Sequence, residues 1–224
     1  MMKGIKVLIL GLALIGFGIG YANAIPIIEL SDGVSIITVS DGGVGDIAPD
    51  SGVVTYFGGI GSFFVSVTTG SNLGSTPGFP ELHLNSIDIS GGVGTLTVKL
   101  TETGLGPVSG LAAGMVTSTG GLTDGSVIFS SYFDNANTAF GEGTLLASLG
   151  AFSGGTFSGE VWTPLLPSAT PFSLTEVAKI THTDGIQTTS FDMEVAVPEP
   201  NTLLLLGFGL LGFGVFGAMR KKIM

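Results

Sequence analysis

The chain of 224 residues contains no cysteine. This excludes disulfides, thiol catalysis and thiolate metal sites, so the core and the hydrogen bonds alone must hold the fold. Basic residues are scarce too, with seven Lys and Arg against seventeen Asp and Glu. Only Lys99 and Lys179 lie away from the two ends, among sixteen acids, which gives this central part a net charge of about −14. Such a surface repels nucleic acid and anionic lipid, and we expect no nucleic-acid partner.

Catalytic motifs are also missing from the sequence. It has no G-x-x-x-x-G-K-[ST] and no G-x-S-x-G segment. A G-x-G-x-x-G pattern at residues 207–212 lies inside an apolar run with no strand before it, which favours close-packing glycines of a membrane helix over a dinucleotide site. The two histidines, His83 and His182, lack the spacing of a zinc site, and a Ser-His-Asp arrangement around either would be a chance pairing. We predict that the protein is not an enzyme.

The C-terminal end carries the most informative pattern. Val197-Pro198-Glu199-Pro200 is followed by an apolar run, Leu203 to Met219, and then by Arg220-Lys221-Lys222. Seventeen helical residues span roughly 25 Å, enough for a short transmembrane helix. The basic cluster acts as a stop and favours the cytoplasmic side, so the preceding residues should lie outside the inner membrane. The two prolines keep the motif extended and out of the helix, as a handle that suits a protease cleft.

This order of Pro-Glu-Pro, apolar helix and basic end resembles the PEP-CTERM sorting signal of Gram-negative bacteria. The resemblance covers residues 197–222, with the motif at 197–200, the transmembrane helix at 203–219 and the basic end at 220–222. It implies processing by exosortase, a membrane-embedded enzyme, near the motif. It also implies loss of the helix and delivery to the cell surface or an exopolysaccharide matrix. It implies nothing about catalysis.

The N-terminal end predicts export as well. Lys3 and Lys6 precede the apolar stretch from Val7 to Ile19, and Ala22 and Ala24 occupy the small-residue positions that signal peptidase reads. We expect a signal helix, cleaved after Ala24. Residues 1–24 are then the signal peptide, 25–196 one exported domain and 197–222 the sorting signal.

The central part predicts β-strands. Apolar residues step by two, the period of one sheet face, in several segments. These are Leu82–Ile89, Leu96–Leu100, Val127–Phe133, Phe172–Leu174 and Phe191–Val197. Pairs such as Asp32-Gly33 and Asp184-Gly185 separate them with turn chemistry, so hairpins should dominate.

We count about ten strands, which predicts an all-β, antiparallel two-sheet sandwich, with a jelly roll as one way of closing it. A slip in the alternation places a bulge at Asn85-Ser86. Two segments break the strict alternation, which fits strands buried on both faces or further bulges: Phe63-Phe64-Val65 and Ile36-Ile37. One interior segment could form a short helical turn, from Thr144 to Leu149.

Two loops and three aromatic residues are the remaining site candidates. Asp41 to Asp46 with Asp50, and Asp134-Asn135-Ala136-Asn137, offer oxygen ligands for calcium, but neither has EF-hand spacing, and Asx hydrogen bonding is the ordinary role of such residues. We predict no cofactor, with calcium as the alternative. The aromatic residues that could stack on sugars are Tyr56, Tyr132 and Trp162.

The sequence therefore predicts a noncatalytic protein, exported and sorted by exosortase, with a structural or adhesive role and exopolysaccharide as a candidate partner. As a precursor it would be anchored in the inner membrane. One alternative is a calcium- or carbohydrate-binding lectin-like module, and the other is a secreted hydrolase. The ligand, the strand order, the oligomeric state, glycosylation and the fate of the processed form are not encoded in any pattern that we recognise.

Overall fold

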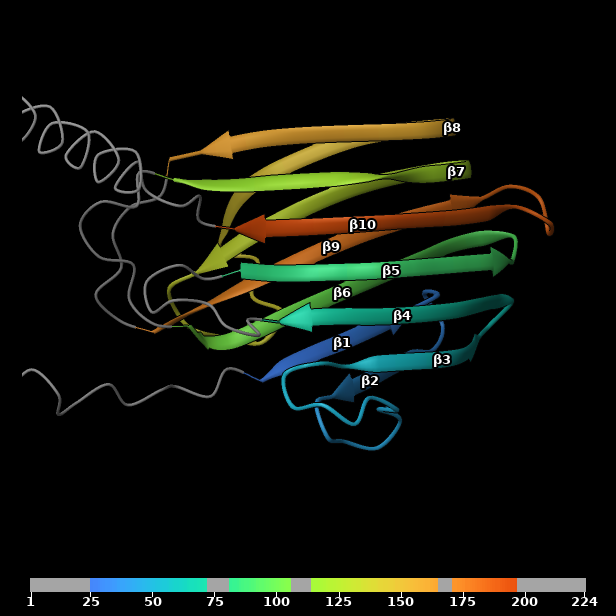
Figure 1. Cartoon of the computed structure of the whole chain (residues 1–224). Helices are drawn as coiled ribbons and strands as arrows, with labels where there is room; N and C mark the ends of the chain where they lie inside the picture. The colour runs from blue at the N-terminus through green and yellow to red at the C-terminus, as the bar shows by residue number, and fades with distance from the viewer. Residues whose placement is uncertain (1–24, 72–80, 106–113, 165–170, 197–224) are drawn as a thin grey trace, which may run out of the picture.

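The computed structural model describes residues 25–71, 81–105, 114–164 and 171–196 (Figure 1). The predicted signal helix and transmembrane helix lie outside these residues. Within them every regular element is a β-strand, and no helix could span a membrane. The strands are β1 Pro26–Ser31, β2 Ile36–Ser40, β3 Thr55–Ile60, β4 Phe63–Ser71, β5 Glu81–Gly91, β6 Gly94–Leu105, β7 Met115–Asp134, β8 Thr144–Thr163, β9 Phe172–His182 and β10 Thr188–Ala196.

All the strand pairings are antiparallel, which confirms the predicted all-β class. Hydrogen bonds join the ten strands in the order β2-β1-β6-β9-β7-β10-β5-β4-β3, and β8 pairs with β7. The expected division into two separate sheets is not confirmed, because this order has no break. The sheet is continuous from β2 to β3.

This sheet folds back on itself, and β7 makes the fold. The first part of β7 pairs with β10, from Val116 to Thr123, and its second part pairs with β9, from Ser126 to Asp134. The hydroxyls of Thr117 and Ser131 lie 2.7 Å apart, although fourteen positions of straight strand would separate them by about 46 Å. Figure 1 shows the result: β3, β4, β5 and β10 form a front layer, and β1, β2, β6 and β9 lie behind them.

The core lies between these two layers. The predicted alternation is confirmed, since Leu96, Val98 and Leu100 are fully buried while Thr95, Thr97 and Lys99 point outward. The buried residues of β6 lie opposite buried residues of β9, since Leu96 pairs with Ile180 and Val98 pairs with Ala178. The buried residues of both layers form one hydrophobic cluster.

The predicted bulge on β5 is present. Phe191 pairs with Ile87 and Met193 with Leu84, so Asn85 and Ser86 together oppose the single residue between Phe191 and Met193. The extra residue restores the inward direction for both Leu84 and Ile87, which are fully buried.

Two other local expectations were wrong. Thr144 to Leu149 is not a helical turn but the start of β8, because its residues pair with the second part of β7. The doubled apolar residues are not buried on both faces. Phe64 is 45% exposed and Ile36 is 67% exposed, each on the outer face of its layer.

Gly121, on the inner side of β7, packs closely against the backbone of β10. A Cβ atom there would clash with the carbonyl oxygen of Ser190 and lie 2.8 Å from Phe191 Cα. We therefore expect Gly121→Ala to lower the free energy of unfolding by about 2 kcal/mol or more, measured by chemical denaturation. The matched control is Gly120→Ala in the same strand, where the nearest atom to the new Cβ is 3.8 Å away. Equal stability of the two variants would contradict the expectation.

Candidate functional site

The residues of the predicted sorting signal, Val197, Pro198, Glu199 and Pro200 with Arg220, Lys221 and Lys222, lie outside the described part of the chain, as do Ala22 and Ala24. The structure does show what precedes the motif. Ala196 is the last residue of β10 and pairs with Glu81 of β5 and Val116 of β7. The motif thus begins directly after a strand that is paired on both sides.

The first calcium candidate is a hydrogen-bonded loop. The carboxylate of Asp46 accepts hydrogen bonds from the backbone N–H groups of Gly42, Ala48 and Thr55, each at 2.9 Å. Asp41 accepts one from Gly52 at 2.8 Å. Burial by itself would raise the pKa of Asp46, but the three amide donors outweigh it and hold the pKa below its usual value.

The second calcium candidate is a loop that crosses the outer face of the rear layer. Asp134 accepts hydrogen bonds from the N–H groups of Ala136 and Thr138, and Asn137 accepts one from Gly104. Both loops therefore use their acidic and amide oxygens to fix the backbone, which is the ordinary Asx role. In the described residues no group of three or more His, Asp or Glu is placed to hold a metal ion.

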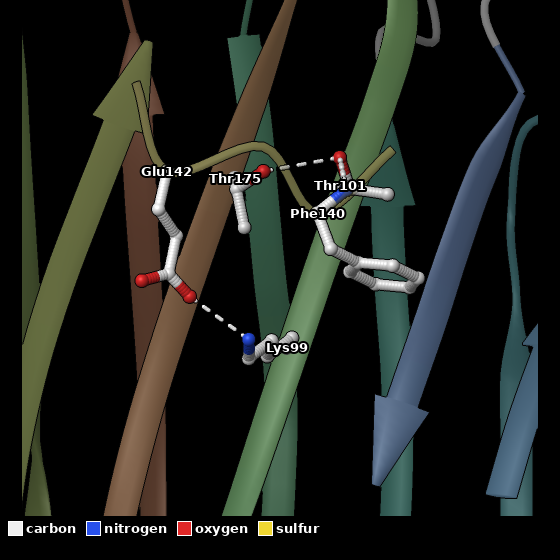
Figure 2. Close-up of polar contacts among 5 residues, drawn as sticks. All are labelled: Lys99, Thr101, Phe140, Glu142 and Thr175. Atoms are coloured by element: carbon white, nitrogen blue, oxygen red, sulfur yellow. Dashed lines mark hydrogen bonds and ion pairs between the residues drawn. The ribbon is translucent and has the colours of Figure 1, made fainter. Parts of the chain in front are cut away.

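Figure 2 shows how this second loop is attached to β6 and β9. The N–H of Phe140 donates to Thr101 Oγ1 at 3.1 Å, and this hydroxyl lies 3.1 Å from that of Thr175. Lys99 Nζ forms an ion pair with Glu142 at 2.9 Å. The loop therefore covers part of the rear layer's outer face and engages one of the two described lysines.

The two histidines take different positions. His83 lies on the outer face of β5, out of phase with the buried Leu82 and Leu84, as predicted. His182 is buried, with Nδ1 at 2.7 Å from the carbonyl oxygen of Gly91 and Nε2 at 2.9 Å from Thr189 Oγ1. Because a carbonyl oxygen only accepts, Nδ1 donates to Gly91. His182 thus connects the rear layer to the front one, and its ring nitrogens are engaged in structural bonds.

The predicted aromatic residues are not brought together. Tyr56 packs against the core and donates its hydroxyl hydrogen to the carbonyl oxygen of Gly59. Tyr132 is half-buried on the outer face of the rear layer. Trp162 is 54% exposed on the outer face of the front layer, at the β8 edge.

Sequence reasoning missed an aromatic pair at the opposite edge of this same face. Phe57 of β3 and Phe64 of β4 are 61% and 45% exposed, and their rings meet edge to face with centroids 4.8 Å apart. The available signal was the doubled apolar run at Phe63-Phe64, which places one of the two rings on the outer surface.

The outer face between these aromatic edges is acidic. The strand register places Phe57, Ser66, Asp88, Ser190 and Leu122 in one row across five strands. We call this outer face of the front layer the acidic face, and its carboxylates are Glu81, Asp88, Glu160, Asp192 and Glu194. It carries no lysine or arginine among the described residues, since Lys99 and Lys179 both lie on the outer face of the rear layer.

Two further carboxyl groups lie inside the core. Glu102 and Glu176 are 1% and 0% exposed. Because Glu102 pairs with Leu174 and Leu100 with Glu176, they are diagonal neighbours on the inner face, with Cα atoms about 7–8 Å apart. Glu176 Oε2 accepts a hydrogen bond from the N–H of Leu84 across the core, while Glu176 Oε1 and both Glu102 oxygens have no partner.

Burial has the expected electrostatic effect on this pair. It raises the pKa of Glu102 to about 8. Burial also raises the pKa of Glu176 well above its usual value, with the N–H of Leu84 acting in the opposite direction. The alternation in the sequence could have predicted that both side chains point inward. Glu102 continues the inward series Leu96, Val98, Leu100. Glu176 continues the inward series Phe172, Leu174.

Comparison with known proteins identifies the C-terminal segment. Residues 196–221 match the family model of the PEP-CTERM protein-sorting motif. No curated protein sequence matches the chain. The resemblance stated from the sequence is thereby confirmed for the tail, which is a small part of the chain.

Solved structures resemble the domain only weakly. One is TmCBM61 in complex with beta-1,4-galactotriose, with 11% identity, TM-score 0.34, and coverage of 69% of this chain and 92% of that chain. Another is the cleaved adhesin domain of Lys-gingipain from Porphyromonas gingivalis, with 11% identity, TM-score 0.30, and coverage of 50% and 74%. A third is a family 29 carbohydrate-binding module, with 12% identity, TM-score 0.27, and coverage of 60% and 92%. Likenesses at this level carry no inference about ligand or fold family.

Loss of the Asp46 carboxylate should loosen the first loop. We expect Asp46→Ala to lower the free energy of unfolding by about 2 kcal/mol, because three backbone donors lose a charged acceptor in a partly exposed site. Thermal and chemical denaturation measure this loss. Asp50→Ala, an exposed residue of the same loop, is the control and should stay within about 0.5 kcal/mol of the parent.

The buried carboxyl pair should make stability fall at high pH. The pKa of Glu102 is raised from 4.5 to about 8 in the folded state, so its favourable contribution is complete below pH 4.5 and is lost as the pH rises through about 8. The loss is of the order of 5 kcal/mol, at about 1.4 kcal/mol per pKa unit. Chemical denaturation at a series of pH values between about 4.5 and 8 gives the free energy of unfolding. This free energy should fall less steeply with pH for Glu102→Gln than for the parent. Glu29→Gln, on the outer face, should keep the parental slope.

Proposed function

We propose that this chain, which carries a PEP-CTERM protein-sorting motif at residues 196–221, is a noncatalytic exported protein. Exosortase would process it near Val197 to Pro200 and deliver it to the cell surface or to an exopolysaccharide matrix. We expect the apolar run at 203–219 to hold the precursor in the membrane. Its role after sorting is structural or adhesive.

The position of the motif relative to the fold is the observation that carries this proposal. Ala196 ends β10, a strand paired on both sides, and the motif follows without a gap. A cut beyond Ala196 removes none of the described strands and none of the described residues of the hydrophobic cluster. The domain can therefore lose its tail and keep its fold, as a sorted protein requires.

The placement of the titratable residues supports a noncatalytic role. His182 has both ring nitrogens in structural hydrogen bonds, and Asp46 and Asp134 hold backbone amides. The carboxylates of both loops thus have a structural role, because they fix the loop backbone. The proposal accordingly includes neither a hydrolase centre nor a resident metal ion.

Changing both tail prolines should block processing. We expect the double variant Pro198→Ala, Pro200→Ala to remain in the membrane fraction with residues up to 224 retained, because the motif loses its extended geometry. Intact-mass analysis of membrane and surface fractions measures this. Pro164→Ala with Pro171→Ala makes the same chemical change at two exposed positions outside the motif and should be processed normally. A tail variant of parental size and destination would refute the proposal.

A further inference from the structure

The acidic face is built as a platform with apolar edges and a charged centre. Phe57 and Phe64 stand on β3 and β4 at one edge, and Trp162 and Leu122 stand on β8 and β7 at the other. Between them β10 and β5 present carboxylates and small polar residues. Five strand spacings of about 4.8 Å separate the two edges by about 24 Å.

The exposed rings are the unusual part of this surface. Phe57 and Phe64 contact each other and lie on the outside of a layer whose inner face already buries Val65, Val67 and Ile89. They therefore contribute little to the core. Exposed aromatic faces next to hydrogen-bonding groups are suited to sugar rings, whose C–H faces stack on them while their hydroxyls bond to neighbouring polar groups.

The charge of the face selects among such ligands. It carries five carboxylates, and the described lysines are on the opposite side of the molecule. An anionic polysaccharide would be repelled, whereas protonated amino groups would be attracted. Asp88 lies two strands from Phe57 in the same row, at about 10 Å, so one chain of sugars can reach both a ring and a carboxylate.

We propose that the acidic face binds a polysaccharide of amino sugars with free, protonated amines. The sugar rings stack on Phe57 and Phe64, and the ammonium groups pair with Asp88 in the same row. This inference rests on the proposed function, because it names the matrix component that would retain the sorted protein. A polymer lying across the strands fits an open sheet face of this width.

The binding test uses the full-length chain in a polyoxyethylene detergent, which introduces no competing sugar. Isothermal titration with glucosamine oligomers should give binding that weakens as ionic strength rises from about 0.1 M to about 1 M, where the screening length falls from about 10 Å to about 3 Å. N-acetylglucosamine oligomers and cello-oligomers of matched length should bind at least about tenfold more weakly. Equal binding of the acetylated and free-amine oligomers would overturn the assignment, as would binding to none of them.

Variants locate the site. Phe57→Ala and Phe64→Ala should each weaken glucosamine-oligomer binding about fivefold, and Asp88→Asn about threefold with a smaller salt dependence. The matched controls on the rear face are Ile128→Ala and Leu145→Ala for exposed apolar area and Glu29→Gln for charge. Loss of binding in the rear-face variants alone would overturn the location.

The result is independent of sorting. Oligomer binding is measured on the unprocessed chain, so its absence refutes the sugar assignment and leaves the processing of the tail untouched. Conversely, a chain that binds the oligomers but is never cleaved would refute the proposed sorting and support this site. Self-association through the acidic face, detected as a dimer that the Phe57→Ala change dissolves, would also overturn the proposal.

Discussion

The architecture depends on β7, a strand that belongs to both layers. β7 pairs with β10 in its first part and with β9 in its second, and its own hydroxyls at Thr117 and Ser131 meet across the core. Folding one continuous sheet in this way forces the inner faces of both halves against each other, which creates the single hydrophobic cluster. It also fixes which side chains share an outer surface, since the register of neighbouring strands is set by the same hydrogen bonds.

Polar contacts tie the two layers together within this apolar interior. His182 links β9 to Gly91 and to Thr189, and Glu176 accepts the N–H of Leu84 beside the β5 bulge. A chain without cysteine has no covalent cross-link to hold the layers, so these bonds and the packing carry that role. Burial of the Glu102 and Glu176 carboxyl groups costs free energy. This cost is lowered because both groups stay protonated, and therefore uncharged, at neutral pH.

The outer faces show how a uniformly acidic composition becomes a patterned surface. The two described lysines fall on the rear layer, where Glu142 pairs with Lys99, while the outer face of the front layer carries five carboxylates and no described lysine. Sequence composition gives the same net charge to any arrangement of these residues. Only the strand order brings Phe57, Asp88 and Leu122 into one row, because they come from β3, β5 and β7.

The amino-acid sequence by itself determined the strands, the β5 bulge and the sorting tail, because period-two alternation, a slip in that period and a linear motif are all local signals. It also contained the inward phase of Glu102 and Glu176, which extend visible alternating series. Tertiary structure alone decided the continuity of the sheet, the strand in place of a helical turn at Thr144 to Leu149, and the outward direction of Phe64. These depend on pairing between residues far apart in the chain, and no local pattern encodes which distant strand becomes a neighbour.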